Sequence, residues 1–138
     1  MAVFVIDASA TLPWCLKDEE SAWTIGLLRR LGTGDRILVP AHWPTEVSNG
    51  LLMATRRKRI PEGRSALFWD ELAFLPIAVE APLSPAQAKS VLALCDRHGL
   101  TAYDAAYLEL AMRIASPLAT LDDALRRAAP SEGVSLIL

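Results

Sequence analysis

The stretch Val3-Phe4-Val5-Ile6-Asp7 lies close to the start of the chain and ends an apolar run with a carboxylate. An uninterrupted apolar run is typical of a strand that is buried on both faces of a parallel sheet. We therefore predict a strand over residues 3–6, with Asp7 at its carboxyl end. The small residues that follow, Ala8-Ser9-Ala10, would let a ligand approach that strand end closely.

Strand-like and helical segments alternate along the rest of the chain. Further strands are predicted at 36–39, 77–79, 118–119 and 134–138, and helices at 9–16, 21–31, 44–58, 64–75, 85–98, 101–115 and 122–129. Alternation of this kind is typical of a mostly parallel sheet with helices on both faces. We expect an α/β fold, a three-layer α/β/α sandwich with four to five strands, in one domain over residues 1–138.

Bulk composition excludes several classes of protein. The chain has 138 residues and is 52% hydrophobic, which suits one core. No apolar run reaches the ~18 residues that a membrane span needs, and no basic segment suggests a signal peptide. Cys15 and Cys95 lack metal-like spacing, so we expect reduced cysteines in a cytoplasmic protein. The net charge of −2 does not favour nucleic-acid binding, although bound metal ions would reverse the local sign.

Four acidic residues, Asp7, Glu46, Asp104 and Asp122, stand where helices are expected to begin. In an open α/β sheet, helix starts that follow strands lie along one rim, where ligands bind. Carboxylates that converge there repel one another unless a cation holds them. Hard oxygen ligands suit Mg²⁺ or Mn²⁺, and the pattern therefore favours metal-dependent phosphodiester chemistry.

Each of these acids has a structural alternative, because Asp and Glu also cap helix starts. Asp104 fits that alternative least well. At about 100° per residue it lies about 140° from Glu109 and about 180° from Arg113, a pair that we expect on the solvent face. Asp104 then faces inward, where a carboxylate must be paired, protonated or bound to metal.

Other polar and aromatic residues keep two interpretations each. Asn49, one turn after Glu46, either orients that carboxylate or is solvated. The basic run Arg56-Arg57-Lys58-Arg59 either ends a helix or contacts RNA phosphates. His42 and His98 have no ligand spacing, so we expect no zinc site. Four tryptophans are expected in the core or at an interface, with stacking on a base as the alternative: Trp14, Trp23, Trp43 and Trp69.

Several segments together resemble a PIN domain of the kind found in VapC-type toxins of bacterial toxin–antitoxin pairs. They are Val5-Ile6-Asp7-Ala8-Ser9-Ala10, the pair Glu46 and Asn49, the run from Leu100 to Ala111, and Leu118-Ala119-Thr120-Leu121-Asp122. The resemblance covers essentially the whole chain, and the run from Leu100 is its most specific part. Asp123 adjoins Asp122, and the family pattern of Thr, one residue, then Asp selects Asp122.

The resemblance implies a Mg²⁺- or Mn²⁺-dependent endoribonuclease. By analogy, Asp7 and Asp104 are the most direct metal ligands, Glu46 and Asp122 complete the site, and Ser9, Asn49 and Thr120 support them. Attack by metal-activated water would leave a 5′-phosphate and a 3′-hydroxyl. A mechanism that uses the RNA 2′-hydroxyl would need a histidine-type acid/base pair, and neither histidine is expected at the site.

The resemblance also implies a homodimer and a small cognate antitoxin that blocks the acidic site. The segment from Arg64 to Leu75 is a candidate docking surface, with plain core packing as its alternative. Binding of DNA is expected only through the antitoxin. Two other hypotheses stay open: a PIN-like nuclease of RNA processing or of structured DNA, and a non-catalytic partner-binding module whose acids are helix caps.

Overall fold

A parallel four-stranded sheet forms the centre of the molecule in the computed structural model, which describes residues 1–138. The strands are β1 (Val3–Ile6), β2 (Arg36–Val39), β3 (Ile77–Val79) and β4 (Leu118–Ala119), in the order β3-β2-β1-β4. Every adjacent pair is parallel, as predicted. The apolar strand β1 is central, and Phe4, Val5 and Ile6 are fully buried.

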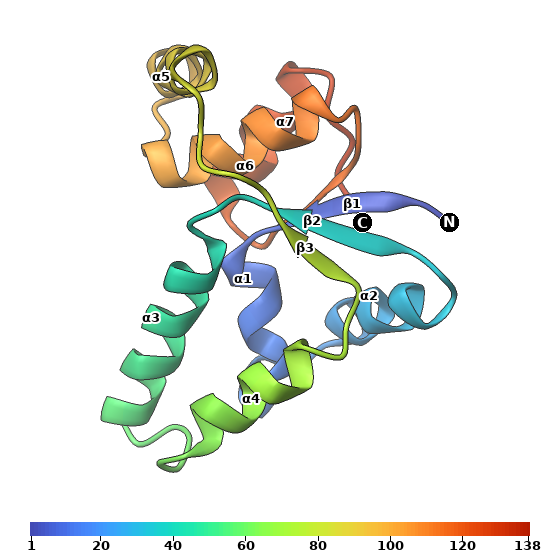
Figure 1. Ribbon diagram of the computed structural model, residues 1–138, viewed down its shortest axis with the longest axis vertical. Helices are drawn as coiled ribbons and strands as arrows, with labels where there is room; N and C mark the ends of the chain where they lie inside the picture. The colour runs from blue at the N-terminus through green and yellow to red at the C-terminus, as the bar shows by residue number, and fades with distance from the viewer.

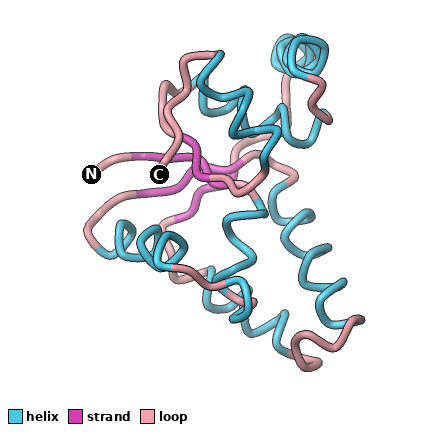
Figure 2. The backbone as a smooth tube through the Cα atoms, turned by 180° about the vertical axis from the view of Figure 1, so that it is seen from behind, coloured by secondary structure: helices cyan, strands magenta, loops and turns pink.

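Helices cover both faces of this sheet (Figure 1). On one side lie α1 (Ala8–Thr11), α2 (Ala22–Gly32), α3 (Trp43–Arg56) and α4 (Arg64–Leu72). On the other lie α5 (Pro85–His98), α6 (Ala102–Arg113) and α7 (Asp123–Ser131). The three-layer α/β/α architecture is therefore confirmed. Figure 2 shows the two termini at the same end of the sheet, away from the carboxyl ends of the strands.

Several element boundaries differ from the prediction. The segment predicted as one helix over 9–16 forms α1 and then a 3-10 turn, Leu12–Trp14, because Pro13 supplies no N–H for α-helical bonding. The helix predicted to end at Ala115 ends at Arg113, since Ala115 adopts a positive φ of 50°. The predicted terminal strand is reduced to one parallel bridge, between Leu118 and Leu136, because β4 has only two residues to pair with.

Buried hydrophobic side chains form one cluster of 32 residues around the sheet. Trp43 lies inside it, donates from its indole Nε1 to the Thr11 hydroxyl at 3.1 Å and meets Trp69 edge to face. Cys15 is buried, Cys95 is half-buried, and both are free thiols as predicted. None of the helices is both long enough and apolar enough to cross a membrane.

Candidate active site

Asp7 occupies the rim where the carboxyl ends of β1 and β4 meet. The two strands pair in parallel at Ile6 and Ala119, so the residues that follow them, Asp7 and Thr120, lie side by side. The Thr120 hydroxyl donates to Asp7 Oδ2 at 2.5 Å, and the Ser9 hydroxyl donates to Oδ1 at 2.7 Å. The N–H of Ala10 also donates to Oδ1, at 3.1 Å, so Asp7 caps α1 as well.

The ionised form of the Asp7 carboxyl group is disfavoured in the folded protein. Its side chain is buried, with the residue only 2% exposed, and burial raises its pKa from 3.8 to about 6. Hydrogen bonds from Thr120, Ser9 and Ala10 oppose this shift, whereas the charge of Asp104 adds to it. Although three groups donate hydrogen bonds to the Asp7 carboxylate, its ionisation in the folded protein remains unfavourable. A bound cation would favour the ionised form.

Asp104 lies in the first turn of α6 and is half-buried. Burial raises its pKa, and the charges of Asp122 and Glu46 raise it further. Asp104, Asp122 and Glu46 lie at the starts of three different helices, and their charges act on one another at the rim. The predicted inward orientation of Asp104 is thus consistent with the structure, although the side chain is not fully enclosed.

Glu46 lies in the first turn of α3 and is held by a residue that the sequence analysis did not select. The buried Tyr107 donates its hydroxyl to Glu46 Oε1 at 2.5 Å, and His42 Nε2 lies 3.4 Å from the same oxygen. Burial would raise the pKa of Glu46, but His42 and Tyr107 outweigh it and hold the pKa below its usual value. Asn49 is exposed and makes no side-chain hydrogen bond to Glu46.

Asp122 is placed by Thr120 and caps the last helix. Its backbone N–H donates to Thr120 Oγ1 at 3.0 Å, and its Oδ2 accepts from the N–H of Leu125 at 2.9 Å. Ser9 closes the same network, because its hydroxyl oxygen accepts from the N–H of Leu121. Asp123 is exposed and outside this network. The hydroxyls of Ser9 and Thr120 therefore link β1 to the start of α7.

The four acids share one electrostatic property. None of them forms an ion pair with a lysine or arginine, although His42 lies beside Glu46 and Arg126 donates from its Nε to the Thr120 carbonyl at 2.8 Å. Some acids elsewhere are paired, for example Asp18 and Glu19 with Arg59, Glu71 with Arg64, and Glu132 with Arg97. The donor set is all oxygen and suits Mg²⁺ or Mn²⁺. No three of these side chains already stand in ligating positions, so metal binding would require side-chain movements.

Two expectations about nearby residues are wrong. Glu109 is only 5% exposed, not solvated, because α5 packs over α6 and Glu109 accepts from Arg113 Nε at 3.0 Å beneath it. His42 lines the site, although neither histidine was expected there, whereas His98 pairs with Glu132 elsewhere. The sequence spacing of both missed residues could have indicated their proximity to the acids. His42 precedes Glu46 by one helical turn, and Tyr107 follows Asp104 by about one helical turn.

The basic run lies away from the acids. It follows the last turn of α3, about 15 Å along the helix from Glu46 at about 1.5 Å per residue. Arg59 is paired with Asp18 and Glu19, while Arg56, Arg57 and Lys58 form no ion pair. Any contact of this run with a nucleic acid would therefore be with a segment some distance from the acidic rim.

The fold is a parallel α/β/α sandwich with several carboxylates at the carboxyl ends of its strands. Comparison with known proteins identifies the family to which a chain with this arrangement belongs. The chain belongs to the PIN domain family, whose model matches residues 4–130. It is 30% identical over 127 residues to a Pyrobaculum aerophilum protein named Ribonuclease VapC3, covering 92% of this chain and 95% of that protein.

Solved structures share the fold at lower identity. PAE2754 from Pyrobaculum aerophilum has a TM-score of 0.68 at 18% identity, over 92% of this chain and 84% of that one. A structure described as VapBC2 from Rickettsia felis bound to a DNA fragment from their promoter has a TM-score of 0.67 at 12% identity, over 98% and 97%. FitAcB from Neisseria gonorrhoeae has a TM-score of 0.66 at 13% identity, over 98% and 96%.

Proposed function

We propose that this protein is a Mg²⁺- or Mn²⁺-dependent endoribonuclease and the toxin component of a toxin–antitoxin pair, acting in the cytoplasm. The observation that carries the proposal is the gathering of Asp7, Glu46, Asp104 and Asp122 at one rim without a lysine or arginine partner. Membership of the PIN family and the likeness to a protein named as a ribonuclease support the same reading.

The residues at the rim have separate roles in the proposed cleavage of RNA. Asp7 and Asp104 would hold a metal ion most directly, and Glu46 and Asp122 would complete the site, in part through water. When bound, the ion would supply an activated water and neutralise charge on the phosphate. Ser9 and Thr120 hold the Asp7 carboxylate in one orientation, and Tyr107 does so for Glu46. Products would carry 5′-phosphate and 3′-hydroxyl ends.

The presence of His42 at the rim does not favour cleavage by the RNA 2′-hydroxyl over hydrolysis by metal-activated water. Attack by the RNA 2′-hydroxyl calls for an acid and a base of histidine type, and His42 is the only histidine at the rim. His98, the other histidine, is engaged with Glu132 on the far part of α5. A single imidazole beside four carboxylates fits hydrolysis by metal-activated water better than it fits a paired acid/base mechanism.

Cleavage of RNA tests this function directly. Wild-type protein with Mn²⁺ should cut a mixed single-stranded RNA, and excess EDTA should abolish the cutting. Asp104→Asn should lose at least about 100-fold in rate, the scale of removing an essential electrostatic group, while its circular dichroism stays unchanged. A well-folded wild type that cuts no RNA, or a fully active Asp104→Asn, would rule the proposal out and leave the partner-binding module as the better account.

We also infer an antitoxin partner and a homodimer. The segment from Arg64 to Leu75 supports a docking role in part: Phe68 and Leu72 are buried and belong to the core, whereas Leu67 is 58% exposed and Phe74 90% exposed. A shallow groove beside Leu67 runs between α3 and α4, lined by residues that include Leu52, Ala66 and Trp69. The candidate docking surface is thus reduced to the exposed side of the segment from Arg64 to Leu75.

Co-expression with the product of a neighbouring small reading frame tests the partner. Co-purification with wild type that is lost on Leu67→Glu would support docking at α4, because that change places a charge on the exposed apolar face. Retained co-purification would move the docking surface elsewhere. Binding of promoter DNA is expected of the complex and not of this chain alone. Sedimentation of the isolated chain tests the homodimer.

A further inference from the structure

A second hollow adjoins the acidic rim. It has a volume of about 310 Å³ and lies between the segment after β2, the connection from β3 to α5, and one side of α6. Its walls include Pro40, His42, Leu83, Tyr103 and Ala106. His42 lines this hollow and also borders the acidic rim, since its Nε2 lies 3.4 Å from Glu46, and Tyr103 directly precedes Asp104. The two sites are therefore continuous.

The lining of this hollow suits a flat ring with a polar edge. Tyr103 is 64% exposed, and its ring centroid lies 5.8 Å from that of His42. Besides Tyr103, the polar side chains of the lining are His42, Glu80 and Arg113, and the latter two are partly exposed. Most of the remaining wall is apolar. Exposed aromatic rings with a nearby polar group are how proteins bind unstacked nucleobases of single-stranded RNA.

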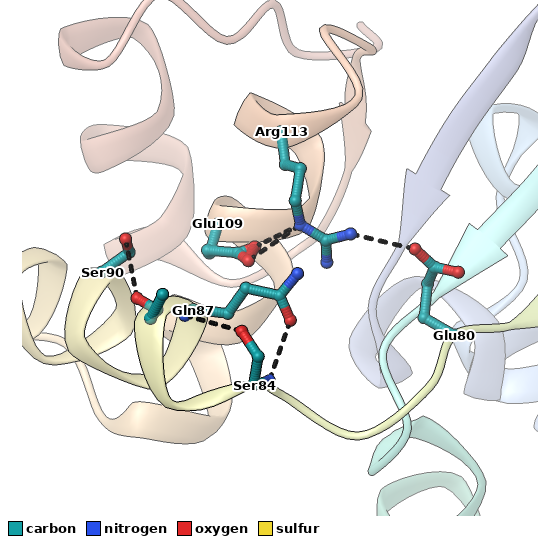
Figure 3. A network of polar contacts seen from close by, with 7 residues as sticks. Glu80, Ser84, Gln87, Ser90, Glu109 and Arg113 are labelled. Atoms are coloured by element: carbon teal, nitrogen blue, oxygen red, sulfur yellow. Dashed lines mark hydrogen bonds and ion pairs between the residues drawn. The ribbon is translucent and has the colours of Figure 1, made fainter.

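The outer wall of the hollow is anchored. Figure 3 shows Arg113 between two carboxylates: its Nε donates to Glu109, and its Nη1 donates to Glu80 at 3.1 Å. Ser84, at the other end of the connection, forms a reciprocal cap with Gln87 at the start of α5 (Figure 3). Residues 80–84 are thus fixed to α6 at one end and to α5 at the other, and the hollow is already formed without a ligand.

We propose that this hollow binds the base of a nucleotide that flanks the scissile phosphate, stacked on the exposed ring of Tyr103. The proposal rests on the ribonuclease function proposed above, and it names the part of the protein that reads the RNA. An RNA whose phosphate lies at the acids can place an adjacent base here, because His42 borders both sites. The substrate is accordingly single-stranded or unstacked at the cleavage point.

Steady-state cleavage of a short single-stranded RNA tests this assignment. Tyr103→Ala should lower kcat/KM about 5- to 150-fold, the range for loss of one base–aromatic stack, while Tyr103→Phe should stay near wild type. Leu92→Ala is the matched control, since it removes a large apolar side chain that is 61% exposed on α5, against 64% for Tyr103, and should change nothing. Ala81→Trp, which fills the hollow from an exposed position, should also lower kcat/KM.

Abasic substrates give the sharper comparison. Removing the flanking base should lower kcat/KM for the wild type but have little further effect on Tyr103→Ala, because the partner of that base is already gone. Cleavage with equal abasic penalties in both proteins would overturn the pocket and leave the nuclease standing. Loss of Mn²⁺ binding by Tyr103→Ala would overturn it too, since Tyr103 would then act through Asp104. A wild type that cuts no RNA defeats both proposals.

Discussion

Asp7 carries the largest electrostatic cost at the rim, and that cost depends on pH. Its pKa in the folded protein is about 6 against an ordinary value of 3.8. A raised carboxyl pKa contributes stability that is present in full below the ordinary value and is lost as the pH rises through the folded one. The ion in a metal-bound protein would reverse this cost, because it favours the ionised carboxylate.

Asp7→Asn should therefore flatten the pH dependence of stability in metal-free protein. Between about pH 4 and pH 7 the wild type should lose up to about 3 kcal/mol of unfolding free energy that Asp7→Asn does not lose. Urea melts in EDTA at several pH values measure the difference between the two proteins. Parallel pH profiles would show that Asp7 ionises freely in the fold.

Tyr107→Phe should weaken the site through Glu46. The change removes the hydroxyl that donates to Glu46 Oε1 and leaves the buried ring in place. We expect a loss of about 1 kcal/mol in unfolding free energy and about 10-fold weaker Mn²⁺ binding, the scale for losing a group that orients a metal ligand. Calorimetry and thermal melts measure the two effects. Tyr103→Phe serves as the control, and equal Mn²⁺ affinities would refute the positioning role of Tyr107.

At the residue scale, sequence reasoning was most successful for groups at strand ends. Asp7 follows an unmistakable buried strand, so its place on the rim could be predicted. His42 and Tyr107 could not be selected with the same ease, because their roles depend on which face of α3 and of α6 fronts the rim. Glu109 was misassigned for a related reason: an i,i+4 pair with Arg113 resembles a solvent-exposed pair, and only the packing of α5 over α6 buries it.

At the scale of elements, α6 ends in a conformation that its sequence does not favour. Ala115 has a φ of 50°, and the N–H of Ser116 bonds the carbonyl of Ala111, the hydrogen bond of a Schellman cap. This cap usually places glycine at the left-handed residue, because a Cβ there costs about 1 kcal/mol or more. The sequence pattern accordingly predicted a helix that runs two residues too long.

Ala115→Gly should raise the unfolding free energy by about 1 kcal/mol, since it relieves the left-handed strain at an exposed position. Ala93→Gly, an exposed change in the middle of α5, should lower it by about as much. Thermal melts of both variants against the wild type measure the contrast. If both changes destabilise, the left-handed strain at Ala115 is not what limits the end of α6.

At the scale of the whole molecule, the alternating pattern predicted the three layers and the parallel sheet because each segment had a clear period and clear breaks. It over-predicted the fifth strand, since pairing depends on the length of the neighbouring strand, and β4 offers only two residues. The convergence of four acids follows from topology and could be anticipated. That none of these four acids forms an ion pair with a lysine or arginine could be seen only in the folded structure.

Relief of carboxylate repulsion should make Asp104→Asn slightly more stable than the wild type without metal. Burial and the charges of Asp122 and Glu46 disfavour its anion, and for a half-exposed group we expect a gain of no more than about 1 kcal/mol. With Mn²⁺ at about 100 times its dissociation constant, the wild type should gain about 2.7 kcal/mol and the variant much less. Thermal melts with and without Mn²⁺ decide this, and marked destabilisation of the metal-free variant would oppose it.

The central claim is that the four rim acids form a metal site, and calorimetric titration of Mn²⁺ tests it most directly. Wild type and Asp104→Asn are titrated side by side, with circular dichroism to confirm that both are folded. We predict saturable binding to the wild type and its loss in Asp104→Asn. Equal binding by both proteins, or no binding by a well-folded wild type, would contradict the account and favour helix capping and partner binding as the work of these acids.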